Sequence, residues 1–251
     1  MTPRRRHPCR LFPGFLLMYS VSHCVPTAYA LTLAEIQTQV RLIVDPSTVT
    51  GKQIFTDAQL QTWINQAHID VIRRSKCMQA TAYVDTSSTT RYVHIPPDAM
   101  TIDRVAYWDG ASTSTLSYRF LARTFKSSLD SKSPSWERPT YGIPQEWFVF
   151  GSSIGLHPIP SAAYAGSARM AIDYTVRVSS LTNASDVPFG DNPTLYPYHL
   201  TLVWYTVWMA YQSIGSLSYA DYYRKMYYDS ISIMITELRD YAGWQPTIRV
   251  Q

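Results

Sequence analysis

One short segment has the residue types of a hydrolase nucleophile. Residues 151–155, GSSIG, fit the pattern G-x-S-x-G, in which a reactive serine sits where a strand turns sharply into a helix. Pro158 and Pro160 follow at once, and proline cannot continue a helix because it lacks an N–H and clashes with the preceding turn. The sequence therefore predicts a hairpin turn here and no nucleophile.

Metal and cofactor chemistry has equally little support. The histidines after residue 30 are scattered: His68, His94, His157 and His199. None is spaced with another ligand residue as metal sites require, so we interpret each as a core or surface residue. The sequence has no glycine-rich phosphate loop. We predict no catalytic residue, cofactor or metal ion, although a pair of acids that meets only through the fold would escape this reading.

The first elements of the body are two capped helices. Thr32-x-x-Glu35 and Thr56-x-x-Gln59 are capping boxes, in which the Thr hydroxyl and the Glu or Gln side chain satisfy backbone N–H groups at a helix start. Apolar residues follow each box at steps of three and four, which predicts two amphipathic helices. Cys77 follows the second helix in an apolar-periodic segment, and we expect a buried thiol without a disulfide partner.

The middle of the chain changes to an alternation of period two. Strands are predicted at 82–84, 91–95, 102–108, 146–150, 154–157 and 168–178. Between them, Tyr118–Lys126 is predicted as a short helix and Ser127–Tyr141 as an exposed, proline-punctuated loop.

Helical periodicity returns at the end of the chain. Segments 200–211 and 223–241 predict two helices, the first apolar nearly all round but far shorter than the ~20 residues of a membrane span. Helices at both ends with strands between them predict an α+β fold, a helical bundle carrying a β-rich insertion. The expected parts are a leader (1–30), an N-terminal helical part (31–80), the β-rich insertion (81–190), a C-terminal helical part (191–242) and a tail (243–251).

Charge and leader must be considered together. The formal net charge of +4 equals the contribution of Arg4, Arg5, Arg6 and Arg10, so the body is neutral and offers no general surface for nucleic acid, although folding or assembly can still create a local basic stripe. The same segment has the layout of a secretory signal peptide, with a basic start, a short apolar core and a small-x-small end at 28–30. A start codon at or after Met18, or a disordered basic arm, are the alternatives.

Aromatic residues are abundant, with 19 Tyr and 7 Trp. Tyr and Trp combine a large rigid surface with a polar tip and are enriched at protein interfaces. Tyr222 and Tyr228 project away from the apolar stripe of the last predicted helix, so we predict that they lie at a subunit interface. Ordinary core packing is the alternative for the tyrosines of the C-terminal third.

Seven segments follow one another in a recognisable order. They are the capped helix with Leu33 and Ile36, then 56–67 (TDAQLQTWINQA), 92–98 (YVHIPPD), 142–145 (GIPQ), 156–160 (LHPIP), 173–174 (DY) and 186–189 (DVPF). Together, over about residues 31–242, they resemble the adaptors of tailed double-stranded DNA bacteriophages, the head-to-tail connector or head completion proteins. The leader departs from that pattern, because phage structural proteins carry no signal peptide, and this favours a later start codon.

The resemblance implies a structural virion protein without enzymatic activity or cofactor. Such adaptors form a ring, typically of twelve copies, beneath the portal in the neck of the virion. The ring extends the DNA channel, retains the packaged genome and receives the tail. The implied partners are further copies of the chain, the portal protein, tail or tail-tube proteins and, transiently, genomic DNA, with no membrane and with assembly in the host cytoplasm.

The resemblance also suggests roles for particular residues. The expected channel residues, sparse because DNA must slide, are Arg73, Arg74 and Lys76. In related adaptors the C-terminal segment docks into the portal, and here the expected docking residues are Tyr241, Trp244 and Arg249.

Two other functions stay open at this level. The first is an exported globular protein, such as a hydrolase, with a cleaved leader. The second is another component of the phage tail, such as a tail-tube protein, which would share the assembly but differ in position.

Overall fold

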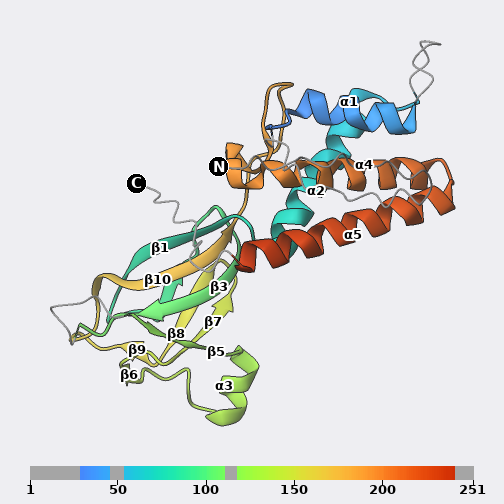
Figure 1. Cartoon of the computed structure of the whole chain (residues 1–251). Coiled ribbons are helices and arrows are strands. Elements are labelled where there is room, and N and C mark those ends of the chain that lie inside the picture. Colours follow the sequence, from blue (N-terminus) through green and yellow to red (C-terminus); the bar gives the residue numbers. More distant parts are fainter. Residues whose placement is uncertain (1–28, 46–53, 111–117, 241–251) are drawn as a thin grey trace, which may run out of the picture.

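The computed structural model describes residues 29–45, 54–110 and 118–240. In Figure 1 the main helices lie together on one side and the strands on the other. Helices precede and follow the strands along the chain, so the predicted α+β class is confirmed. The four long helices are α1 (Leu33–Val44), α2 (Asp57–Ser75), α4 (His199–Ser213) and α5 (Leu217–Asp240).

Both predicted capping boxes are present. Thr32 Oγ1 accepts the N–H of Glu35, and the Glu35 carboxylate accepts the N–H of Thr32 at 2.8 Å. Thr56 and Gln59 make the same reciprocal bonds at the start of α2. These bonds satisfy N–H groups that have no partner inside the helix, so the sequence positions of α1 and α2 follow from local chemistry.

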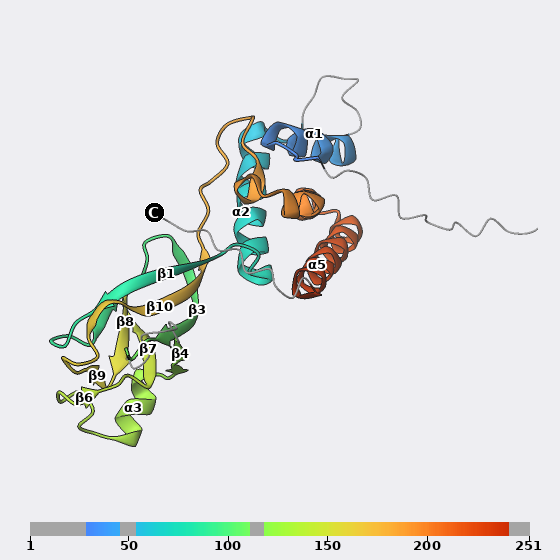
Figure 2. The ribbon, with the colours of Figure 1, turned by 60° about the vertical axis from the view of Figure 1, so that its left-hand side comes forward.

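Helices α1, α2, α4 and α5 share one apolar core. Helix α4 packs against α1, α2 and α5, and Figure 2 shows it between α1 and α5. Leu60 and Ile64 of α2, Leu202 of α4 and Met234 of α5 are all at most 1% exposed. Burying one such side chain contributes about 1.5–3 kcal/mol. The central place of α4 explains why its sequence is apolar nearly all round.

The strands form two four-stranded sheets and one small pair. The first sheet has the order β1 (Gln79–Thr86), β10 (Gly166–Val176), β3 (Ala99–Tyr107) and β4 (Arg119–Phe120), all antiparallel. The second has the order β2 (Tyr92–His94), β8 (Ser153–His157), β7 (Glu146–Phe150) and β5 (Ala122–Arg123). Strands β6 (Tyr141–Gly142) and β9 (Ile159–Pro160) form the parallel pair.

The two sheets enclose a second apolar core. Val105 and Ile172 of the first sheet pack with Trp147 and Leu156 of the second, each at most 1% exposed. Gly155 on β8 lets the Phe148 ring lie directly over the backbone, because a Cβ at this position would meet the ring at 2.2 Å. The β-rich part is thus a small sandwich with its own core.

The segment between β3 and β7 differs from the prediction. Tyr118–Lys126 is not a helix: it contains β4 and β5, which pair with β3 and β7. The helix α3 (Lys126–Lys132) lies instead within the segment predicted as a loop. It is held by a contact with distant residues, since Leu129 and Trp136 pack on Phe148 of β7, and no side-chain cap marks its start.

The loop from β10 to α4 ties the helices together. Asn65 of α2 donates its amide to the Leu181 carbonyl at 3.0 Å and accepts the Leu181 N–H at 2.8 Å. Farther along, the N–H groups of Leu33 and Ala34 bond to the carbonyls of Asp186 and Ala184. Short 3₁₀ turns, η2 (Pro188–Asp191) and η3 (Pro193–Tyr198), lead into α4.

Candidate functional site

The predicted hydrolase motif is a hairpin turn, as expected. Residues 151 and 152 connect β7 to β8, whose antiparallel register runs from Glu146 opposite His157 to Phe150 opposite Ser153. Gly151 has a positive φ of 59°, which suits a tight turn. No strand-to-helix elbow exposes a serine here.

Two of the histidines are core residues with a shared role. His68 Nε2 accepts the N–H of Phe189 at 2.9 Å, and His199 Nδ1 accepts the N–H of Leu31 at 2.9 Å. Both side chains are almost fully buried. Burial, and for His68 also the neighbouring His199, lowers each pKa to about 4. Each histidine therefore serves as a neutral acceptor at neutral pH.

Metal chemistry has no candidate in the part of the chain that the structure describes. No group of three His, Cys, Asp or Glu side chains lies there in an arrangement that could hold an ion. Cys77 is buried, as predicted, and burial raises the pKa of its thiol to about 11.

The most polar cluster lies on the last turns of α2. Arg73 and Arg74 both pair with Asp70, Arg74 through Nε at 2.6 Å, and Tyr227 of α5 donates its hydroxyl to the same carboxylate at 2.7 Å. Burial alone would raise the pKa of Asp70, but the hydrogen bonds from Tyr227, Arg74 and Arg73 together hold it below its ordinary value. Two guanidinium groups share one carboxylate, so the cluster keeps one net positive charge.

Beside this cluster lies a groove between α2, α4 and α5, of about 400 Å³. Ile69 and Tyr228, which are 44% and 40% exposed, line it together with Tyr205 and Trp208. The guanidinium of Arg74 lies 5.3 Å from the centre of the Tyr228 ring, a cation–π contact. The structure thus brings Tyr228, predicted at an interface, together with Arg74, predicted in the channel.

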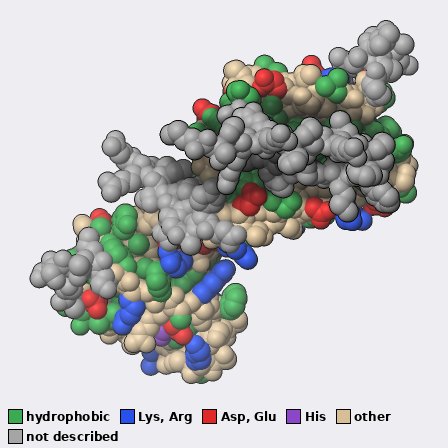
Figure 3. Space-filling model, viewed as in Figure 1, with side chains coloured by type: hydrophobic (Ala, Val, Ile, Leu, Met, Phe, Trp, Pro, Cys, Tyr) green, Lys and Arg blue, Asp and Glu red, His purple; other side chains and the backbone are tan. Residues whose placement is uncertain are grey.

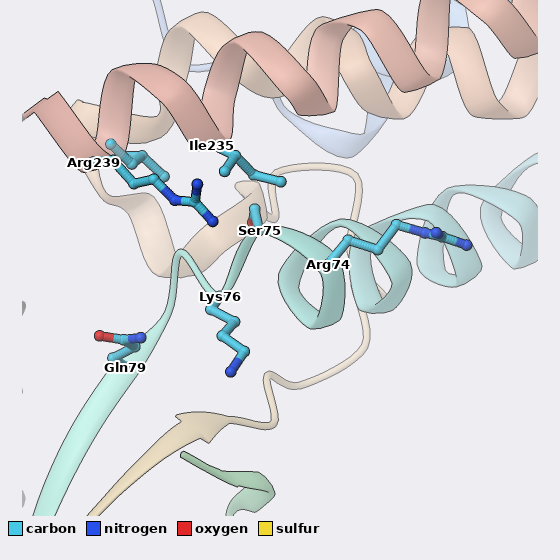
Figure 4. Close-up of a pocket in the computed structure, with 7 residues that line it drawn as sticks. Arg74, Ser75, Lys76, Gln79, Ile235 and Arg239 are labelled. Carbon is cyan, nitrogen blue, oxygen red and sulfur yellow. The ribbon is translucent and has the colours of Figure 1, made fainter. Parts of the chain in front are cut away.

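Lys76 is directed elsewhere. It ends α2 in a left-handed conformation, and its ammonium pairs with Asp103 of β3, whose other oxygen accepts from Thr175 of β10 at 2.8 Å. Figure 4 shows Lys76 directed toward the strands and Arg74 directed away from Arg239 of α5. A cavity of about 330 Å³ lies here, lined also by Ser75 and Ile235. The predicted channel residues therefore occupy two ion-pair networks.

Positive charge is unevenly distributed on the molecule. On the face seen in Figure 3, Lys and Arg side chains lie mainly over the β-rich part and at its junction with the helices. Several stand over aromatic rings, including Arg104 over Phe120 at 4.2 Å and Arg123 over Trp147 at 5.4 Å.

The C-terminal tyrosines divide into two groups. Tyr211 stacks on Tyr223 with ring planes 10° apart, and Tyr205 meets Tyr227 edge-on, so these rings fill the α4–α5 interface. Tyr222 is 59% exposed and makes an edge contact with Tyr223. The predicted docking residues Tyr241, Trp244 and Arg249 lie outside the described residues.

Several segments of the phage resemblance meet in space. Asp98 accepts the Tyr174 hydroxyl at 3.1 Å on each oxygen, and Gly142 pairs with Pro160 between β6 and β9. These contacts show that Asp98, Tyr174, Gly142 and Pro160, which belong to the segments of the resemblance, stabilise the fold. Compared with known protein families, residues 31–251 match the SU10 adaptor protein family.

The chain belongs to the SU10 adaptor protein family. A search of the curated proteins gave no match. This is a phage head–tail adaptor family, so the chain is an adaptor of the virion, a structural and non-enzymatic kind of protein that interacts with other head and tail proteins. Within the described ranges, no helix of this adaptor is both long enough and apolar enough to cross a bilayer.

The sequence analysis did not identify Asp70 and Asn65 as residues that link distant segments of the adaptor. In the sequence Asp70 is only one polar residue of a predicted helix, and its partner Tyr227 lies 157 positions away. The resemblance included Asn65, but its contact with Leu181 spans 116 positions. No local pattern signals contacts of this kind.

Proposed function

We propose that this adaptor is one subunit of a closed ring that joins the portal to the tail of its phage. The ring extends the DNA channel and retains the packaged genome. The observation that carries the proposal is the family match over residues 31–251. A subunit with two different, complementary binding surfaces is well suited to a ring. Head-to-tail contacts between copies close into a ring when the rotation from one subunit to the next allows it.

The exposed aromatic residues support an assembly role. Besides Tyr222 and Tyr228, large apolar side chains lie exposed on the β-rich part, among them Tyr83, Phe120, Phe125 and Phe150. Exposed apolar surface of this kind is typical of proteins that bind other proteins. In the proposal the helices (31–80 and 191–242) and the β-rich insertion (81–190) present separate surfaces to different partners.

Contact with DNA is assigned to Arg73, Arg74 and Lys76. Their side chains are 59%, 42% and 51% exposed, although each is paired with an acid. Partly neutralised guanidinium and ammonium groups would touch phosphates weakly, which favours sliding over tight binding. The proposal places twelve copies around the channel. It places Tyr241, Trp244 and Arg249, at the C-terminal end of the chain, against the portal.

A phage with a stop codon in this gene tests the function. We expect heads that package DNA, lose it on purification and carry no tails, and restoration by the full chain supplied in trans. Tailed, infectious particles formed without the protein would contradict the proposal.

Deleting residues 242–251 should abolish binding to the portal, and unchanged binding would refute the assigned role of the C-terminal segment.

A further inference from the structure

Helix α5 carries a second apolar stripe that faces away from the helical core. Tyr222, Met226, Asp229 and Ile233 follow at steps of four, three and four residues, so they share one helix face. Tyr222 and Ile233 are 59% and 56% exposed. An outward stripe of this kind on a helix predicts a contact with another molecule.

One acid lies in the middle of this stripe. Asp229 is exposed and has no ion-pair partner among the residues that the structure describes. The nearby acid Asp221 differs, because it pairs with Arg224 at 3.1 Å on its own helix. The stripe therefore offers an apolar surface with one acid that makes no ion pair within the described residues, and the exposed Lys225 lies one helical turn before it.

The groove beside Asp70 has the complementary character. Its walls are apolar and aromatic, from Ile69, Trp208 and Tyr228. At its edge Arg73 and Arg74 share the single carboxylate of Asp70, and the side chain of Arg73 is 59% exposed. The groove thus offers an apolar surface with one excess positive charge.

Stripe and groove lie on different sides of α5. Tyr228 is displaced by roughly 130° around the helix axis from the middle of the stripe, at about 100° per residue. One copy therefore cannot fill its own groove with its own stripe, whereas two copies can join the two surfaces head to tail. Such a contact is heterologous and propagates around a ring.

We propose that the α5 stripe of one copy occupies the α2–α4–α5 groove of the next, with Asp229 paired to Arg73 across the interface. The inference rests on the proposed ring. It places Arg73 in the subunit contact, so that the proposed contact with DNA falls to Arg74 and Lys76. It assigns Tyr222 to one side of the subunit contact and Tyr228 to the other. Apolar contacts provide the area, and the charge pair sets the register, since a like charge at this position would be repelled.

Charge reversal in the full chain, expressed together with its portal protein, tests the pairing. Ring–portal complexes are counted by native mass spectrometry and electron microscopy. Asp229→Arg and Arg73→Glu should each reduce the yield of rings about tenfold or more. The double variant should recover most of the wild-type yield. Asp221→Arg, which changes the charge equally but lies off the stripe, should assemble normally, and thermal melting checks that each variant folds.

The outcomes separate the interface from the function. The proposed interface is wrong if Asp229→Arg forms rings as well as the wild type does. It is also wrong if both single variants are defective and the double variant does not rescue them. In both cases the proposed ring itself is unaffected. If Arg73→Glu forms normal rings that no longer bind the portal or the phage tail, the groove binds another protein and the proposed subunit interface is wrong. No ring from the wild-type chain with its portal would instead contradict the proposed function.

Discussion

The buried histidines make the fold sensitive to mild acid. His68 and His199 accept backbone N–H groups of Phe189 and Leu31 as neutral rings, so protonation removes both acceptors and places charge in the core. Burial is the main cause of the pKa of about 4 for each, and the neighbouring His199 further lowers that of His68. In the unfolded chain a histidine titrates near 6.5.

The sign follows from the difference in bound protons. Between pH 6.5 and 4 the unfolded chain binds more protons than the folded chain, so the free energy of unfolding falls as the pH falls. Above pH 6.5 both histidines are neutral in the folded and the unfolded chain, so the free energy of unfolding keeps its full value. At pH 5 the free energy of unfolding is lower by roughly 2 kcal/mol per histidine, because each pKa unit corresponds to about 1.4 kcal/mol. The pair would lose about 4 kcal/mol, a large part of a typical domain stability of about 5–15 kcal/mol.

Urea unfolding of the full chain at pH 7.5, 6 and 5, followed by tryptophan fluorescence, measures this loss. A matched variant combines His68→Gln with His199→Asn, whose amide oxygens can take the places of Nε2 and Nδ1 without titrating. We expect a much flatter pH profile for this variant. Equal stability of the wild type at pH 7.5 and 5, or an unchanged slope in the double variant, would refute the assignment of both histidines as neutral core acceptors.

Two substitutions test the packing of the two cores. Leu60→Asp places a charge in the core of the helices, where Leu60 is 1% exposed, and should lower the free energy of unfolding enough to unfold the helical part. Leu42→Asp is the control, because Leu42 on α1 is 61% exposed, and it should change the melting temperature little. Gly155→Ala forces a methyl group against the Phe148 ring and should destabilise the sandwich by about 1–3 kcal/mol, measured by urea unfolding. A normal melting curve for Leu60→Asp, or a neutral Gly155→Ala, would show that the described register is wrong.

Local chemistry was enough to predict the long helices and most strands. The capping boxes at Thr32 and Thr56 place α1 and α2 within the sequence, and the GSSIG turn follows from the prolines after it. These signals lie within a few residues of the elements they define. The α+β class then follows from the order of the elements alone.

The parts that escaped prediction depend on distant contacts. Helix α3 has no capping side chain and is held by Leu129 and Trp136 against Phe148, so local pattern favoured a loop. The Asp70 network is equally invisible in the sequence, because Tyr227 reaches it from another helix. The exposure of Tyr222 agrees with its predicted position off the core stripe of α5, whereas its assignment to an interface stays a prediction.

Electron microscopy of the native neck would show whether this chain forms the ring beneath the portal. A reconstruction of the portal–neck region from particles of the phage that encodes this chain would show which protein lies beneath the portal. We expect a closed ring of this adaptor coaxial with the portal, with its channel continuous with that of the portal. Density in which another protein fills that position, with this chain absent from the particle, would contradict it.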